Sequence, residues 1–81
     1  MLERSLDRGA LGDLSPGEVE ALGMAARGMT NAQIAKRVGV SIYAIKFRLA
    51  SVYRKLQVSN RTEAAVMFLD HERSLVSHRG E

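Results

Sequence analysis

The sequence contains no cysteine, and this absence excludes several kinds of stabilisation and chemistry. Without thiols there is no disulfide bond, no thiolate metal site and no thiol nucleophile. The two histidines, His71 and His78, lie near the C-terminus without further ligand types at zinc-binding spacing. We therefore expect no metal and no cofactor. A domain of 81 residues must then rely on closely packed helices or on a second subunit.

Long apolar runs are also absent. The longest uncharged apolar stretch, residues 64–69, is far shorter than the roughly 20 residues that a membrane-spanning helix needs. The sequence has no recognisable export signal, which favours a cytoplasmic location. It also lacks paired carboxylates in a cleft, a nucleophile with a neighbouring base and a glycine-rich phosphate loop, so we expect no enzyme.

Acidic residues are missing from the middle of the chain. Between Arg27 and Arg61 there are eight basic residues and no acidic one, so all nine acids lie outside this stretch. The basic residues are Arg27, Lys36, Arg37, Lys46, Arg48, Arg54, Lys55 and Arg61. Solvated helix surfaces usually mix both signs, so a block of one sign indicates a polyanionic partner. A basic surface that only maintains solubility is the simpler alternative.

Four segments begin with patterns typical of helix N-termini. The candidate caps are Ser15 with Glu18, Thr30 with Gln33, Ser41, and Asn60 with Glu63. Pro16 suits the first position of the first helix, and Gly28 and Gly39 can end the first two helices. We therefore predict an all-α fold, with helices from residue 16 to about 28, over 31–38, over 42–57, and from 61 to about 71.

Apolar spacing within these segments predicts their buried faces. In the third segment, apolar residues recur at intervals of three and four: Ile42, Ile45, Leu49, Val52 and Leu56. The first segment shows similar spacing at Val19, Leu22, Ala26 and Met29. Gly23, inside that helix, costs about 0.5–1 kcal/mol relative to alanine. Such a glycine is more often tolerated than useful, and the alternative is that it permits a close helix approach.

The opposite face of residues 42–57 carries a different set of side chains: Tyr43, Lys46, Phe47, Ala50 and Arg54, with Arg48 and Ser51 at its margins. A helix with its side chains is about 10–12 Å across, and the major groove of B-DNA is about 12 Å wide. The short helix, turn and longer helix over residues 30–56 therefore have the chemistry of a DNA-reading unit, whose longer helix enters the groove.

Taken together, these residues resemble the LuxR-type helix-turn-helix domain, a four-helix DNA-binding module of many bacterial transcription regulators. The matching residues are Leu14-Ser15-Pro16-x-Glu18, Gly28-Met29-Thr30-Asn31, Ile34-Ala35, Val40-Ser41, Ile45-Lys46, Lys55-Leu56 and Asn60-Arg61-Thr62-Glu63-Ala64. No single pair is informative, but their joint order and spacing are specific. We place the domain at residues 14–71, between an N-terminal arm (1–13) and a C-terminal tail (72–81).

The resemblance implies roles for individual residues. The base-reading candidates are Lys46, Phe47 and Ala50 from the family pattern, and Tyr43 from the same face. The candidates for backbone contact or positioning are Thr30, Asn31, Ser41, Lys55 and Arg61, together with the cationic Lys36, Arg48 and Arg54. Phe47 suits the methyl group of thymine, and Lys46 is the main hydrogen-bonding reader.

Three positions depart from the family pattern. Gly17 replaces a usual arginine, Ala44 a usual threonine, and Arg48 a usual histidine. Gly17 removes a charge from the first helix, and Ala44 removes a hydroxyl near the groove. Arg48 adds a permanent positive charge. With few polar readers left, sequence discrimination is expected to be modest or partly based on DNA shape.

The fourth predicted helix is apolar around its whole circumference over residues 64–69. A surface helix needs only one apolar stripe, so part of this surface must be covered by something. We interpret Ala65, Val66 and Leu69 as the self-complementary patch of a two-fold homodimer. The alternative is that these three are small exposed hydrophobes with no partner.

Two functions from different classes remain open. The first is a transcription regulator whose homodimer reads near-palindromic half-sites in double-stranded DNA, about one helical turn apart. The second is a protein-interaction module on the same scaffold, in which Tyr43 and Phe47 bind RNA polymerase or a partner regulator. Salt-dependent binding to random duplex DNA separates the two.

Overall fold

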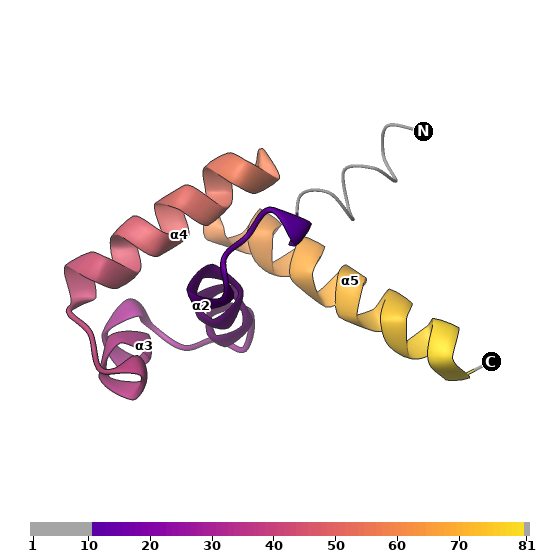
Figure 1. Cartoon of the computed structure of the whole chain (residues 1–81), viewed down its shortest axis with the longest axis horizontal. Coiled ribbons are helices and arrows are strands. Elements are labelled where there is room, and N and C mark those ends of the chain that lie inside the picture. The colour runs from indigo at the N-terminus through magenta and orange to yellow at the C-terminus, as the bar shows by residue number, and fades with distance from the viewer. Residues whose placement is uncertain (1–10, 81) are drawn as a thin grey trace.

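The computed structural model describes the backbone of residues 11–80 and the side chains of residues 11–73. Within these residues the chain forms helices α2 (Pro16–Ala26), α3 (Asn31–Val38), α4 (Ile42–Leu56) and α5 (Arg61–Gly80), arranged as Figure 1 shows. No strand occurs in this part of the chain, so the predicted all-α fold is confirmed. No helix there has the length and apolar character that a membrane span requires. Most of the predicted N-terminal arm, residues 1–10, lies outside the described residues.

The first two helices begin at the predicted capping boxes. The Ser15 hydroxyl accepts a hydrogen bond from the Glu18 N–H at 3.2 Å, and the Glu18 carboxylate accepts one from the Ser15 N–H at 2.9 Å. Thr30 and Gln33 make the same reciprocal pair before α3. These contacts satisfy N–H groups that a helix start leaves without partners, and each cap typically contributes about 1 kcal/mol.

The turn between α3 and α4 also follows the prediction. Gly39 ends α3 in the left-handed conformation, with φ of +82°, which a glycine adopts without steric cost. Two residues later the Ser41 hydroxyl accepts a hydrogen bond from the Ala44 N–H at 3.1 Å and caps α4. A short, locally determined connection therefore sets the angle between these two helices.

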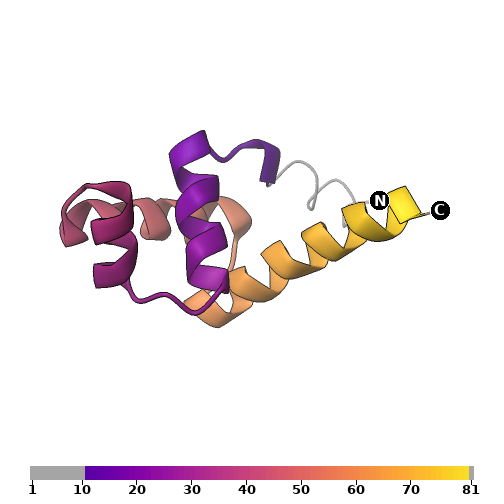
Figure 2. The same cartoon turned by 90° about the horizontal axis from the view of Figure 1, so that it is seen from below.

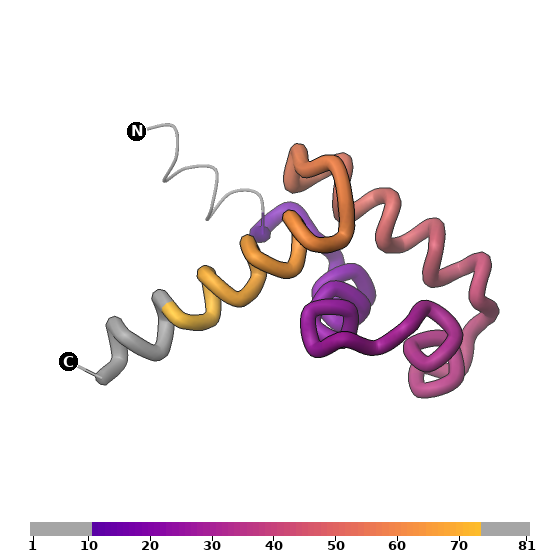
Figure 3. Tube along the Cα trace, turned by 180° about the vertical axis from the view of Figure 1, so that it is seen from behind, coloured from indigo at the N-terminus to yellow at the C-terminus, as the bar shows by residue number. Residues whose placement is uncertain are grey.

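Helix α2 is the central element of the fold. It packs against α4 on one side and α5 on the other, while α3 packs against α4 (Figures 1 and 3). One buried cluster comprises Leu14, Leu22, Val52, Leu56 and Ala64. The other comprises Ala21, Ala25, Ile34, Ala35, Ile45 and Leu49. Tyr53 packs against both clusters and so links the two halves of the core.

Two residues expected in the buried faces are exposed. Val19 is 39% exposed and Ile42 is 43% exposed. Because α2 contacts helices on two sides, its buried face centres on Ala21 and Leu22 and is not the single stripe that the spacing predicted. Ile42 is the first residue of α4, and side chains of a helix lean toward its N-terminus, so there is no preceding turn of α4 to cover it.

The last helix is longer than predicted. We expected it to end near His71, but α5 continues to Gly80, so the predicted end of this helix is wrong. Residues 72–79 contain neither proline nor glycine, so backbone propensity sustains the helix after the apolar periodicity has ended. The first half of α5 lies against α2, and the helix then leads away from the other three (Figure 2).

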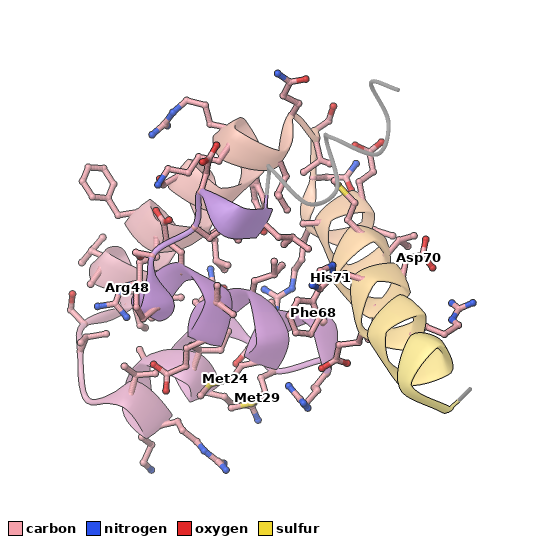
Figure 4. The ribbon with its side chains drawn as sticks, turned by 45° about the vertical axis from the view of Figure 1, so that its right-hand side comes forward. Met24, Met29, Arg48, Phe68, Asp70 and His71 are labelled. Atoms are coloured by element: carbon pink, nitrogen blue, oxygen red, sulfur yellow. The ribbon has the colours of Figure 1, made fainter. Side chains whose placement is uncertain are left out.

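Gly23 lies where α2 meets α5. A Cβ atom at this position would lie 3.4 Å from Cζ of Phe68 and 3.3 Å from Nη1 of Arg27. Phe68 projects from α5 toward α2 in Figure 4. The Arg27 guanidinium also donates a hydrogen bond to the Gly23 carbonyl at 3.0 Å. The missing side chain therefore allows the close approach of the two helices.

Replacing Gly23 by leucine tests this contact. The larger side chain meets the Phe68 ring, so we expect the free energy of unfolding to fall by about 1–3 kcal/mol, as overpacking usually causes. Urea unfolding followed by circular dichroism measures the change. The control is Ala32→Leu on the exposed surface of α3, which should change stability by less than about 0.5 kcal/mol. Equal stability of both variants and the parent would contradict the proposed packing.

Candidate nucleic-acid interface

The outer face of α4, which we define as Tyr43, Lys46, Phe47, Ala50 and Arg54, is exposed along its length. Tyr43 is 79% exposed and Phe47 is 81% exposed. The ammonium group of Lys46 lies over the Tyr43 ring, 5.8 Å from its centroid. The structure therefore brings the four predicted base-reading side chains together on one solvent-facing surface.

The side of α4 opposite this outer face holds the helix in place. Ile45, Leu49, Val52 and Leu56 are buried, which leaves the outer face free of any packing role. Helix α4 runs along one edge of the molecule in Figure 1. A rigid helix whose outer side chains make few internal contacts is suited to entering a groove of another molecule.

Arg48 lies at the margin of the outer face and reaches α2. A Cβ atom on Gly17 would lie 3.4 Å from the guanidinium carbon of Arg48, so this side chain covers the first turn of α2 (Figure 4). Two of the three departures noted in the sequence are therefore neighbours in space. Gly17 leaves the first turn of α2 without the arginine that is usual in the family. The Arg48 guanidinium of α4 supplies a positive charge at the same place.

Lys55, predicted to contact the DNA backbone, makes two internal hydrogen bonds. Its ammonium group donates to Oε1 of Glu18 at 2.9 Å and to the Asp13 carbonyl at 3.2 Å. The Ser51 hydroxyl donates to the other carboxylate oxygen of Glu18 at 2.7 Å. These contacts tie the last turns of α4 to the start of α2. An ammonium group has three N–H bonds, so one remains for a further acceptor.

The Glu18 carboxyl group is buried, at 8% exposure, and its pKa is lowered from 4.5 to about 2. Burial by itself raises this pKa, because it disfavours the charged form. The hydrogen bonds from the Ser15 N–H, Ser51 and Lys55, together with the positive charge of Lys55, outweigh that effect. The carboxylate therefore stays ionised in the folded domain.

Arg61 makes a second link, between the starts of α5 and α3. Its Nη1 donates to Oδ1 of Asn31 at 3.0 Å, and its Nη2 donates to the Met29 carbonyl. The guanidinium has five N–H bonds, so these contacts fix its position without using all its donors. The hydroxyls of Thr30 and Ser41 accept capping hydrogen bonds and keep their own O–H as donors.

Lys36 and Arg54, the remaining predicted backbone contacts, are exposed. Lys36 lies on α3 and, with Met29, Gln33 and Arg37, lines an open hollow. Arg54 lies in the last turn of α4. The predicted backbone-contacting residues are thus spread over the starts of α3, α4 and α5 and along α3 and α4, and do not form one cluster.

The predicted dimer patch lies on α5. Val66 is 54% exposed and Leu69 is 42% exposed, while Ala65 is half-buried. Figure 4 shows Phe68 and His71 on the side of α5 that faces α2, and Asp70 on the other side. Among the residues whose side chains are described, no group of three or more His, Cys, Asp or Glu could hold a metal ion.

Comparison with protein families places these features in a known context. The family model described as "Bacterial regulatory proteins, luxR family" matches residues 13–68, most of the chain. The chain belongs to this family. The resemblance seen in the sequence is thereby confirmed. The family model covers all the motif residues on which that resemblance was based, from Leu14 to Ala64.

Curated relatives of this luxR-family chain are named as regulators. It is 39% identical over 69 residues, 85% of its length, to a "Probable transcriptional regulatory protein SgaR" of Hyphomicrobium methylovorum. It is 42% identical over 57 residues, 70% of its length, to a "Putative HTH-type transcriptional regulator YhjB" of Escherichia coli. A "Nitrate/nitrite response regulator protein homolog" of Haemophilus influenzae is 33% identical over 73 residues, 90% of the chain.

The luxR-family chain spans about a third of the length of these relatives, with coverage of 33%, 28% and 35%. The similarity therefore concerns the helical domain and not the whole of each relative. No solved structure matches the chain at a significant level.

The buried network around Glu18 in this luxR-family domain was not found from the sequence. The capping pattern identified the bond between Glu18 and Ser15, but Ser51 and Lys55 lie 33 and 37 residues further along the chain. No local spacing relates residues so far apart. The one available hint was that the predicted helix over residues 42–57 carries basic residues and no acidic one, so an acid packed against it would meet only cations.

The pH dependence of stability tests the role of Glu18. Since its pKa falls from 4.5 to about 2 on folding, its contribution is fully present above about pH 4.5 and is lost as the pH falls toward 2. We expect the parent domain to be more stable than Glu18→Gln at pH 7, and this difference to shrink between pH 4.5 and pH 2. Urea unfolding of both proteins across this range measures it. A difference independent of pH would contradict the ionised network.

Proposed function

We propose that this domain binds double-stranded DNA and regulates transcription, with the outer face of α4 in the major groove. The observation that carries the proposal is this exposed face on a rigidly held helix, set in a stretch of chain with eight basic residues and no acidic one. Membership of the luxR family and the names of the relatives support it.

In this proposal the cationic side chains neutralise phosphates and release counterions, while the outer face of α4 contacts base edges. Tyr43, Lys46, Phe47 and Ala50 are the base-reading residues. The phosphate contacts come from the other basic side chains, Lys36, Arg48, Arg54, Lys55 and Arg61, with Thr30, Asn31 and Ser41 as positioning residues. Lys55 and Arg61 reach their phosphates through the N–H groups that their internal contacts leave free.

The difference between a base reader and a phosphate contact can be measured with two lysine variants. Lys46→Ala should weaken binding to the selected operator by about tenfold and binding to random duplex much less, because it removes a base contact. Lys36→Ala on α3 is the matched control and should weaken both by the same factor. Fluorescence anisotropy at several fixed salt concentrations gives the four affinities. Indistinguishable behaviour of the two variants would contradict these assignments.

We further propose that two copies pair through α5 and read a near-palindromic site. The exposed Val66 and Leu69 support this, because exposed apolar side chains are removed from water when a second copy covers them. Two α4 helices related by a two-fold axis would then enter successive major grooves about one helical turn apart.

A single charge placed in the patch tests the dimer. Val66→Glu buries an unpaired carboxylate between the two copies, so we expect the dimer dissociation constant to rise by at least about tenfold. Sedimentation equilibrium without DNA measures this constant. The matched control is Ala32→Glu on α3, which makes the same change of charge outside the patch and should leave the constant unchanged. Unaltered association of Val66→Glu would exclude this surface.

The exposure of both Tyr43 and Phe47 also favours a second candidate function, a module that binds RNA polymerase or a partner regulator through these rings. Binding to random duplex at low and high salt separates the two. A polyanion contact weakens steeply as salt rises, whereas a complete lack of duplex binding at any salt favours the protein-interaction module.

A further inference from the structure

The aromatic residues of this chain are divided between two environments. The sequence has two tyrosines and two phenylalanines. Tyr53 and Phe68 pack against the hydrophobic core. Tyr43 and Phe47, one helical turn apart on the outer face of α4, are 79% and 81% exposed. Both exposed rings therefore lie on the surface that is proposed to meet DNA.

The two exposed rings differ in what they already contact. The Lys46 ammonium lies over the face of Tyr43, and Tyr43 also has a polar hydroxyl. Phe47 has no donor or acceptor. It lies in the middle of the outer face, four residues after Tyr43 and three before Ala50. Phe47 is therefore the large apolar contact that this face offers to the floor of the groove.

The major groove presents mostly polar edges to such a ring. Guanine, adenine and cytosine offer donors and acceptors there, and covering them with an apolar ring leaves them without partners. Thymine adds a methyl group at C5, which is an apolar contact. The favourable neighbour for Phe47 is consequently a pyrimidine that carries a C5-methyl group.

We infer that Phe47 recognises the C5-methyl group of a pyrimidine in the major groove, so that the methyl group determines affinity more than the base that carries it. This inference rests on the proposed function. A phenyl ring makes no directed hydrogen bond to O4 of thymine or N4 of cytosine, and therefore discriminates poorly between these two bases. The domain accepts 5-methylcytosine where it accepts thymine, and its binding responds to cytosine methylation at that position.

The first experiment removes methyl groups from DNA. In a duplex selected from a random library by binding to this domain, each thymine is replaced in turn by deoxyuridine, which lacks only the methyl group. At one position in each half-site, affinity should fall by about fourfold, the effect of exposing one buried methyl group. Replacing both symmetric positions should multiply the two factors, giving about 15-fold.

The second experiment adds a methyl group to cytosine. At the same position, a cytosine–guanine pair should weaken binding, and 5-methylcytosine opposite guanine should restore most of the loss. Protein variants then identify the side chain responsible. Phe47→Ala should bind the thymine and deoxyuridine duplexes equally well, and because Phe47 is exposed its thermal unfolding should match that of the parent.

Two further variants serve as controls. Tyr43→Ala should keep the ratio of thymine to deoxyuridine affinities, which separates the two rings. Lys36→Ala should lower both affinities by the same factor, because a phosphate contact does not sense the methyl group.

Three outcomes would overturn the inference. If the domain binds a specific site but tolerates deoxyuridine at every position, the methyl reading is wrong and the proposed function stands. If Phe47→Ala still binds the thymine duplex more tightly than the deoxyuridine duplex, the methyl group acts through another residue or through DNA shape. If no duplex is preferred over random DNA, the proposed sequence-specific function fails, and the inference fails with it.

Discussion

The position of α4 depends on one buried carboxylate. Glu18, in the first turn of α2, accepts hydrogen bonds from its own capping residue and from two side chains of α4, Ser51 and Lys55. A buried charge is costly unless it is paired and fully hydrogen-bonded, and this one meets both conditions. The same group thus begins α2 and anchors α4, so that a local capping interaction also sets the arrangement of two helices.

A second link completes the frame. Arg61 joins the first residues of α5 to those of α3. Helix α2 is held between α4 and α5, and the two hydrophobic clusters fill the spaces on either side of it. With its inner side fixed in this way, α4 has no structural need for the residues of its outer face. Those residues, including the exposed Tyr43 and Phe47, are available for contacts with another molecule.

The basic residues fall into two groups that carry the same charge: some face solvent, and others are hydrogen-bonded within the domain. Lys46, Lys36 and Arg54 are exposed and face solvent, whereas Lys55 and Arg61 are held by hydrogen bonds within the domain. Both kinds make the surface positive, which favours DNA at long range. The internally bonded ones also hold their remaining N–H groups in fixed directions, so the proposed phosphate contacts would cost less side-chain entropy.

The sequence by itself determined the features that arise within a few residues. The capping boxes, the glycine stop at Gly39 and the apolar seam of α4 are local, because they depend on backbone geometry and helical periodicity, and they sufficed to predict the outer face of α4. The family resemblance came from the order and spacing of the matching residues. The tertiary structure decided what depends on distant residues or on neighbouring helices. It exposed Val19 and placed Ser51 and Lys55 on Glu18, since only packing brings segments more than thirty residues apart into contact.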